Sequence, residues 1–332
     1  MLNSKTLHHL KDKKNLLAFS AGGDSTALFF LLQDSDIDFD IAIVNYGIRE
    51  QSKDEVAYAK NLSTTYNKKC HVFNADIIEK NFEASAREIR YDFFEELIKE
   101  FHYDNLLTAH HLGDRFEWML MQFCKGAGCV EIAGMQIIEK RENYQLIRPV
   151  LECEKNELLE YLNSKKINYF EDETNLDKTI KRNSFRHNYS NPLLEKYKDG
   201  IRKSFNYIDI DREDLISEIE VNSINKFAYF KSSNNKRSDI YTIDKYLKSC
   251  GHLASKHERE LLKTEKTVIL GRKFVVNQDK KYVFIIPYLH KDIGIMDKEF
   301  KEKMRILKIE PKLRTYLNKD REAYNKIIEL ST

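Results

Sequence analysis

The stretch Ser20-Ala21-Gly22-Gly23-Asp24-Ser25 lies between two apolar runs, residues 16–19 and 26–32. The first run is typical of a short buried strand, and the second of a buried helix. A tight Ser/Gly loop between a strand and a helix binds phosphate, because its backbone N–H groups converge and the helix N-terminus carries partial positive charge. The sequence therefore predicts a phosphate-binding loop at residues 20–25.

The side chains of this loop suggest which ligands it takes. The hydroxyls of Ser20 and Ser25 can donate to phosphate oxygens, whereas the carboxylate of Asp24 would repel them. We interpret Asp24 as a ligand of Mg²⁺ that lies between it and the phosphates. No Lys follows the glycines, so the loop is not a Walker A loop, and it also lacks the G-x-G-x-x-G spacing. The alternative is a glycine-rich turn without a ligand.

The loop resembles the Ser-Gly-Gly-x-Asp-Ser loop of the ATP pyrophosphatase (PP-loop) family, which splits ATP between its α and β phosphates. One residue departs from that pattern, because Ala21 stands where the family usually has its first glycine. Alanine favours negative φ, so we expect a negative φ at Ala21 unless the loop tolerates strain. On this resemblance, residues 20–25 bind ATP.

Composition indicates a soluble globular protein of two or three domains. The chain has 332 residues, of which 42% are hydrophobic and 33% charged, and no stretch approaches the length of a membrane span. Its first 14 residues are polar and lead into no apolar signal region. The five cysteines form no C-x-x-C pair, which is typical of thiols in a reducing compartment. We expect a cytoplasmic protein that binds no membrane.

Charge is distributed unevenly along the chain. Residues 221–332 contain 25 Lys and Arg against 14 Asp and Glu, a net charge of +11, which leaves −9 for residues 1–220. A basic region attached to an acidic body suggests a polyanionic partner such as a nucleic acid. The alternative is a lysine-rich solvated surface.

Strands and helices alternate through the first half of the chain. Expected strands cover residues 39–44, 70–73, 106–108 and 144–147, and expected helices cover residues 52–66, 81–101 and 112–123. Repeated β-α units predict an α/β fold, a doubly wound and mostly parallel sheet. In such sheets ligands bind at the carboxyl ends of the strands, so residues 20–25, 45–47 and 109–111 should converge.

The second half is less regular. We expect helices at residues 155–165 and 192–207 and strands at residues 267–271 and 281–286. Residues 1–208 form the predicted ATP-binding catalytic domain, and residues 209–224 form a connector. Residues 225–332 then form a smaller helical or mixed domain, whose basic charge suits a polyanionic partner.

Two acids and two histidines are candidates for the site. Asp114 and Glu117 stand three residues apart on one helix face, an arrangement that suits a cationic amine or a metal. Their alternative role is to complement the helix dipole. His110 and His111 are consecutive and cannot easily chelate one metal. We expect His110 to hydrogen-bond the nucleotide, the phosphates or the loop, with packing as the other option.

Arginines supply the remaining candidates. Arg87 lies on a helix whose start carries small residues, which would let a ligand approach closely. Arg182 and Arg186 stand four apart on one helical face, and guanidinium forks suit phosphate oxygens. Arg87 could instead be an ordinary solvated side chain.

Together these residues resemble one branch of the PP-loop family, the tRNA(Ile)-lysidine synthetases. The matching blocks occur in family order from residue 16 to about 193: residues 45–49 with Ser52 and Glu55, 83–91, 108–111 with Asp114 and Glu117, 126–128, 134–135, 147–149, 172–175, 182–183 and 186–187. Four positions depart from the family pattern, namely Tyr46, Gly113, Arg115 and Trp118. The basic C-terminal third, with residues 225–332 as its domain, matches only in broad character, as a short accessory tRNA-binding domain.

The resemblance implies a two-step reaction. ATP adenylates the C2 oxygen of the wobble cytidine (position 34) in tRNA(Ile) with a CAU anticodon, and the ε-amine of free L-lysine then displaces AMP. Mg²⁺ and ATP are the implied cofactors, with Asp24 as metal ligand and Asp24, Asp114 and Arg87 as catalytic residues. Asp114 and Glu117 would bind lysine, and the arginine pair would hold phosphate of ATP or tRNA.

Three other functions stay open from the sequence. A PP-loop tRNA thiolation enzyme would typically need cysteine pairs, which the chain lacks. A PP-loop amidotransferase partner would not need a basic tail. A non-catalytic RNA-binding protein on the same fold would not need the retained acids. The sequence leaves the oligomeric state open, with a homodimer among the options.

Overall fold

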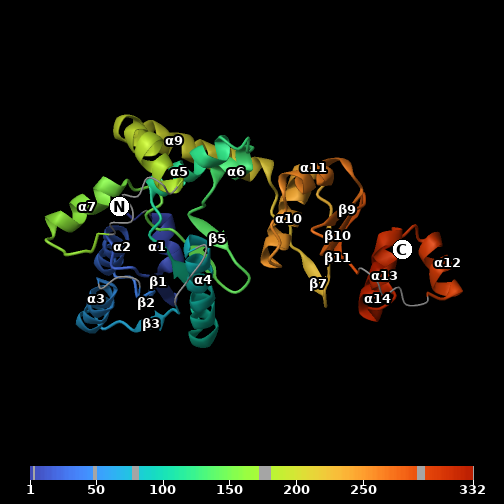
Figure 1. Cartoon of the computed structure of the whole chain (residues 1–332), viewed down its shortest axis with the longest axis horizontal. Helices are drawn as coiled ribbons and strands as arrows, with labels where there is room; N and C mark the ends of the chain where they lie inside the picture. Colours follow the sequence, from blue (N-terminus) through green and yellow to red (C-terminus); the bar gives the residue numbers. More distant parts are fainter. Residues whose placement is uncertain (3, 48–50, 77–81, 172–180, 290–295, 332) are drawn as a thin grey trace. The chain divides into compact units, whose positions relative to one another are not determined.

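The computed structural model describes the chain except for residues 3, 48–50, 77–81, 172–180, 290–295 and 332 (Figure 1). It consists of two compact units, Met1–Ile210 and Asp211–Thr332. The division falls inside helix α9 (Asn191–Leu215), whereas the sequence suggested a connector at residues 209–224. The end of that predicted connector, Asn222–Ile224, forms strand β7 of the second unit.

A six-stranded sheet forms the centre of the first unit, in the order β3-β2-β1-β4-β6-β5. Its strands are β1 (Asn15–Ala18), β2 (Asp40–Asn45), β3 (Cys70–Asn74), β4 (Asn105–Leu107), β5 (Ile138–Lys140) and β6 (Gln145–Ile147). All neighbouring pairs are parallel except β5 with β6. The predicted doubly wound, mostly parallel sheet is confirmed, and only the short strand β5 was not predicted.

Helices cover both faces of this sheet. Side chains of α2 (Gly23–Asp34), α3 (Gln51–Thr65) and α7 (Lys155–Ser164) form one buried cluster with the strands, which includes Phe29, Leu62 and Leu158. Helix α4 (Phe82–Phe101) buries Phe94 and Leu97 against the other face. A short helix, α1 (Ser4–Leu10), precedes the first strand.

The strand order places two loops next to each other. Strand β1 lies between β2 and β4, and the chain leaves β1 for one neighbour and later returns on its other side. The loops that follow β1 and β4 therefore emerge side by side at the carboxyl ends of the strands, where open α/β sheets bind ligands. These are the predicted phosphate loop and the segment that contains the two histidines.

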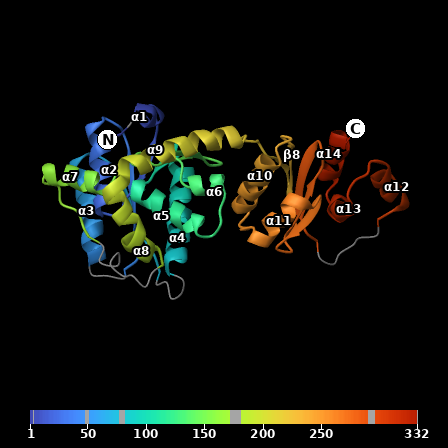
Figure 2. The same cartoon turned by 90° about the horizontal axis from the view of Figure 1, so that it is seen from above.

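The helix that follows the second of these loops is surrounded by other helical segments (Figure 2). Helix α5 (Leu112–Phe123) contacts α6 (Cys129–Ala133), α8 (Lys181–Phe185) and a π-helical turn η2 (Arg186–Ser190). Leu112 and Phe116 of α5 also form a buried cluster with Leu194 and Phe205 of α9. Segments far apart in sequence thus meet on one helix.

The second unit has a five-stranded antiparallel sheet in the order β7-β8-β11-β10-β9. Besides β7, its strands are β8 (Phe227–Lys231), β9 (Thr267–Leu270), β10 (Phe274–Gln278) and β11 (Tyr282–Pro287). One buried cluster joins this sheet to α10 (Lys236–Ser249) and α11 (Lys256–Thr264). Another joins it to α12 (Lys298–Ile306), α13 (Pro311–Leu317) and α14 (Arg321–Ser331).

The observed boundary changes the charge comparison. Residues 211–220 carry five acids and one Arg, and they belong to the second unit rather than to the acidic body. The unit Asp211–Thr332 has a net charge of +7, and Met1–Ile210 has −5. The second unit is still basic, although less strongly than the sequence division at residue 221 suggested. Within the described residues, no helix is both long and apolar enough to span a membrane.

Candidate active site

The phosphate-binding loop is held in shape by its own serines. Ser25 Oγ donates to Gly22 O at 3.1 Å and accepts from the Ser20 backbone N–H at 3.2 Å. The hydroxyls of Ser20 and Ser25 lie 3.0 Å apart. Ala21 is fully buried with φ +59°, so the expected negative φ at this residue is wrong. A left-handed alanine costs about 1 kcal/mol or more, and the loop tolerates that strain.

Helix α2 starts inside this loop. Its N-cap is Gly22, which offers no side chain to satisfy the first backbone N–H groups of the helix. A Cβ atom on Gly23 would lie 2.8 Å from Leu159 Cδ2, so a larger residue there would have to push this side chain of α7 aside. The helix terminus therefore presents backbone donors and a positive dipole end for an anion.

Asp24 points from this helix start toward α5. Its Oδ1 atom is buried and has no hydrogen-bond partner among the residues that the structure describes. Its Oδ2 atom lies 3.8 Å from His111 Nε2. A buried carboxylate oxygen without a donor fits a cation, and Mg²⁺ is commonly held by one or two carboxylates together with substrate phosphates. In the described part of the chain, no three His, Cys, Asp or Glu side chains group to hold a metal alone.

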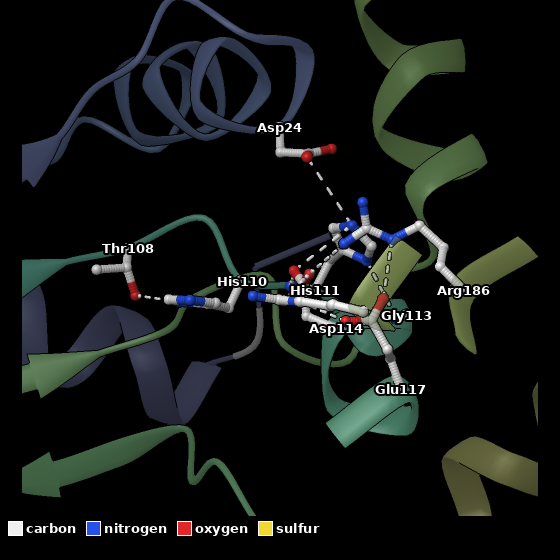
Figure 3. Close-up of polar contacts among 9 residues, drawn as sticks. Asp24, Thr108, His110, His111, Gly113, Asp114, Glu117 and Arg186 are labelled. Atoms are coloured by element: carbon white, nitrogen blue, oxygen red, sulfur yellow. Dashed lines mark hydrogen bonds and ion pairs between the residues drawn. The ribbon is translucent and has the colours of Figure 1, made fainter. Parts of the chain in front are cut away.

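His111 links the loop to helix α5 (Figure 3). It is the N-cap of α5. Its ring atom Nδ1 accepts a hydrogen bond from the Gly113 backbone N–H at 3.0 Å, and its backbone N–H donates to Asp114 Oδ2 at 3.1 Å. In the neutral ring the proton is then on Nε2, which faces both Asp24 and, at 3.6 Å, Asp114. A Cβ on Gly113 would approach the His111 ring to 2.7 Å, which explains a glycine at this departing position.

Asp114 and Glu117 meet Arg182 and Arg186 in a four-residue cluster, which we call the acid–arginine cluster. Arg182 donates to Asp114 Oδ1 at 3.0 Å and through its Nε to Glu117, while Arg186 Nε donates to Glu117 Oε2 at 2.9 Å. Arg186 Nη2 also lies 3.4 Å from Asp114 Oδ1. Figure 3 shows these carboxylates directed at the Arg186 guanidinium.

Burial differs within the acid–arginine cluster. The Glu117 side chain is 1% exposed and that of Asp114 12%, whereas Arg182 and Arg186 are 37% and 22% exposed. Burial by itself would raise the pKa of Asp114, but the facing histidines and arginines hold it well below its usual range. Asp114 is therefore ionised at neutral pH.

His110 lies at the end of β4, beside the same cluster. Its Nδ1 is 2.9 Å from Thr108 Oγ1. Burial lowers the pKa of His110 to about 4, an effect that Asp114 opposes and that nearby arginines, Arg87 among them, strengthen. His110 is thus neutral at pH 7. Arg87 is exposed on α4, with its guanidinium 4.8 Å from the Tyr91 ring centre, and is close enough to act on His110 electrostatically.

A buried arginine supports the helix that carries the two acids. Arg115 is 2% exposed and donates from Nε and Nη2 to Ala133 O of α6. Its Nη1 donates to Asp209 of α9 at 3.0 Å, and its guanidinium lies 4.3 Å from the Phe205 ring centre. Arg115 therefore ties α5 to α6 and α9 and fixes the helix on which Asp114 stands.

The structure brings most of the predicted residues to one end of the sheet. Asp24, His110, Asp114, Glu117, Arg182 and Arg186 are directly linked or share neighbours there. The sequence reasoning did not assign His111 a role. Its position immediately before a helix could have predicted this role, because N-cap side chains accept hydrogen bonds from backbone N–H groups of the first turn. Residues 48–49 and 172–175, also part of the family pattern, lie outside the described residues.

Comparison with known proteins agrees with this geometry. The family model described as a PP-loop domain matches residues 2–193. In fold, the chain is similar to the U34-tRNA thiolase NcsA of Methanococcus maripaludis, with a TM-score of 0.52 over 65% of this chain and 78% of that one. Their sequences are 18% identical, so this likeness concerns the fold alone. The first unit is thus a PP-loop ATP-binding fold.

Relatives in sequence narrow the class further. A tRNA(Ile)-lysidine synthase of Helicobacter pylori is 42% identical over 312 residues, covering 94% of this chain and 91% of that protein. The tRNA(Ile)-lysidine synthase of Campylobacter jejuni is 40% identical over 332 residues, covering 100% of this chain and 98% of that protein. The Wolinella succinogenes protein of the same name is 42% identical over 308 residues, covering 92% and 93%. The chain belongs to the tRNA(Ile)-lysidine synthase family.

Proposed function

We propose that this chain is an ATP-dependent carbon–nitrogen ligase that forms lysidine on tRNA(Ile), changing the codon that the tRNA reads from AUG to AUA. The observation that carries the proposal is the pairing of two elements at one sheet edge. One is a helix start open to phosphate, and the other is the acid pair Asp114 and Glu117, whose carboxylates can hold an ammonium group. The full-length similarity to tRNA(Ile)-lysidine synthases supports it.

The first step transfers AMP from ATP to the C2 oxygen of the wobble cytidine. The loop at residues 20–25 would hold the phosphates through backbone N–H groups, and Asp24 would hold Mg²⁺ through its partnerless Oδ1. Bound there, Mg²⁺ would neutralise charge that develops on the leaving pyrophosphate. Neutral His110 can hydrogen-bond the nucleotide without adding charge, and Arg87 adds a cation for the phosphates.

The second step needs free L-lysine held with its amine toward the activated C2. Asp114 and Glu117 are the proposed lysine-binding residues, because their carboxylates lie together and Asp114 stays ionised. The guanidinium groups of Arg182 and Arg186 lie against these carboxylates, at the positions that an ammonium group would take. Lysine binding would therefore rearrange the acid–arginine cluster and release donors of Arg182 and Arg186 toward phosphate of ATP or tRNA.

The second unit is the proposed tRNA-binding domain. Its net charge of +7 would attract the tRNA backbone, mostly through phosphates and without reading bases. We further propose that the reaction occurs in the cytoplasm, because ATP, free lysine and tRNA meet there.

One experiment tests the reaction. The full chain is incubated with ATP, Mg²⁺, L-lysine and a tRNA(Ile) transcript with a CAU anticodon, and the RNA is digested for nucleoside mass analysis. We expect lysidine in place of one cytidine. A transcript with uridine at the wobble position is the matched control and should stay unmodified.

The same reaction separates the rival functions. Omission of lysine should leave pyrophosphate release on the CAU transcript but no lysidine. A thiolated nucleoside in the presence of a sulfur donor would instead indicate a thiolation enzyme. Absence of both pyrophosphate release and modification, with RNA still bound, would indicate a non-catalytic RNA-binding protein.

A further inference from the structure

Trp118 is the only tryptophan of the chain, and its side chain is 45% exposed. It stands on α5 four residues after Asp114 and next to Glu117. Residues four apart on a helix are neighbours on one face, with Cβ atoms about 5–6 Å apart. The indole therefore lies beside the proposed lysine-binding acids, although large apolar rings are normally covered.

A glycine supports the indole. Gly134 follows α6 with φ +63°, and a Cβ on it would lie 2.7 Å from Trp118 Cδ1 and 3.2 Å from its Nε1. The edge of the ring thus packs closely against the backbone at Gly134. Because one side is fixed while much of the ring faces solvent, Trp118 offers a rigid aromatic surface rather than a buried core contact.

We infer that Trp118 is the residue on which the extruded wobble cytosine stacks, an inference that rests on the proposed function. The target base must leave the anticodon stack before its C2 can reach ATP and lysine, and extruded bases are commonly held on aromatic rings. The ring is on the same face as Asp114, so a base stacked on it would lie near the acids that hold the attacking amine. The partly exposed Arg182 and Arg186 on the same side suit the flanking phosphates.

Fluorescence tests this contact without relying on turnover. Because the chain has one tryptophan, emission excited at the red edge of tryptophan absorption, where the 18 tyrosines do not absorb, reports Trp118 alone. The full-length protein is titrated with a CAU anticodon stem–loop and with the same RNA lacking the base at the wobble position. We expect quenching with the first RNA and little with the second, at concentrations where a labelled-RNA assay shows both bound. Equal quenching by both RNAs would overturn the inference, and so would equal quenching by ATP alone, which would assign the ring to adenine.

Kinetics supply a second readout. Stacking of one base on an aromatic ring strengthens the binding constant by about 5- to 150-fold. Trp118→Ala should lower kcat/KM for tRNA by a factor in this range and leave the KM for lysine unchanged, whereas Trp118→Phe should retain most activity. Phe123→Ala is the control, because Phe123 is 66% exposed on the same helix, five residues on and therefore on another face.

The outcomes separate this inference from the proposed function. If wild-type protein forms lysidine but Trp118→Ala, with a melting curve like wild type, keeps its kcat/KM for tRNA, the stacking role is wrong and the function stands. If wild-type protein forms no lysidine, the proposed function fails. Base-dependent quenching would then still identify Trp118 as an RNA contact.

Discussion

The phosphate-binding loop and the acid–arginine cluster are neighbours in the fold but are built differently. The loop is one continuous stretch of six residues, and it offers mainly backbone donors at a helix start. The cluster joins two segments about 65 residues apart through paired, partly buried side chains. The loop therefore offers backbone donors at a helix start, whereas the carboxylates of the cluster are already paired with guanidinium groups, which lysine would have to displace under the proposed function.

The sharpest test of this comparison is Asp24→Asn. Loss of the loop's only carboxylate should lower tRNA-dependent pyrophosphate release by about 10²- to 10³-fold, because the leaving group loses its electrostatic stabilisation. Lysidine formation should fall equally, since it follows the first step. Asp34→Asn, at the other end of α2, is the control and should keep wild-type release. Wild-type release by Asp24→Asn would exclude the metal-ligand role.

Glu117→Gln should affect the two steps unequally. Removing one partner of a buried charge pair costs about 2–5 kcal/mol, so we expect the KM for lysine to rise about 30-fold or more. Pyrophosphate release without lysine should change much less. Glu131→Gln, on the exposed surface of α6, is the matched control. If both steps of Glu117→Gln fall together while the melting curve is normal, the cluster supports the fold or the nucleotide rather than lysine.

Arg182→Lys and Arg186→Lys test whether the cluster needs guanidinium forks. Each arginine donates to both acids, and a single ammonium cannot reproduce that geometry. We expect kcat/KM to fall about tenfold per variant, the value of one charged hydrogen bond. Unchanged kcat/KM in both variants and in Arg87→Lys would mean that positive charge alone is sufficient.

Exposed lysines outside the loop and the acid–arginine cluster test whether the second unit binds tRNA through its charge. Lys298 and Lys301 are exposed on α12 of the basic unit. Replacing both by Gln should flatten the slope of log affinity against log salt by up to about 1.4, or about 0.7 per lost phosphate contact. The exposed Lys53 and Lys60 of α3 form the matched control pair. Equal effects of the two pairs would argue against tRNA binding by the second unit.

The smallest effect is expected at Ala21→Gly, which tests the tolerated strain in the loop. Glycine relieves the cost of a left-handed alanine but gains entropy in the unfolded chain, so the two contributions partly cancel. Stability should rise by no more than about 1 kcal/mol, measured by denaturant unfolding, and pyrophosphate release should stay near wild type. A clear loss of stability would show that the buried methyl group of Ala21 packs better than its backbone strain costs.

Local sequence patterns were sufficient to predict most strands and the longer helices of the first unit. Strand β1, the loop and α2 are consecutive, and their apolar runs and glycines specify them without distant contacts. Helix α5 begins and ends where the sequence predicted it. By contrast, β5 and α6 have three and five residues, too few to show a period. In the described part of the second unit, β7, β8, β10 and the five helices were missed, because short apolar runs there do not distinguish strand from helix.

The sequence by itself determined the parallel sheet and the strand–loop–helix around residues 20–25, and it singled out most of the residues that meet at one end of the sheet, because each depends on local spacing or on a recognisable pattern. Only the tertiary structure decided which side chains face each other. It paired Asp114 and Glu117 with Arg182 and Arg186, placed His111 between Asp24 and Asp114, and set Trp118 against Gly134. These contacts arise when α5, α6, α8 and α9 pack together, and charges that are close only after packing leave no periodic signal in the chain.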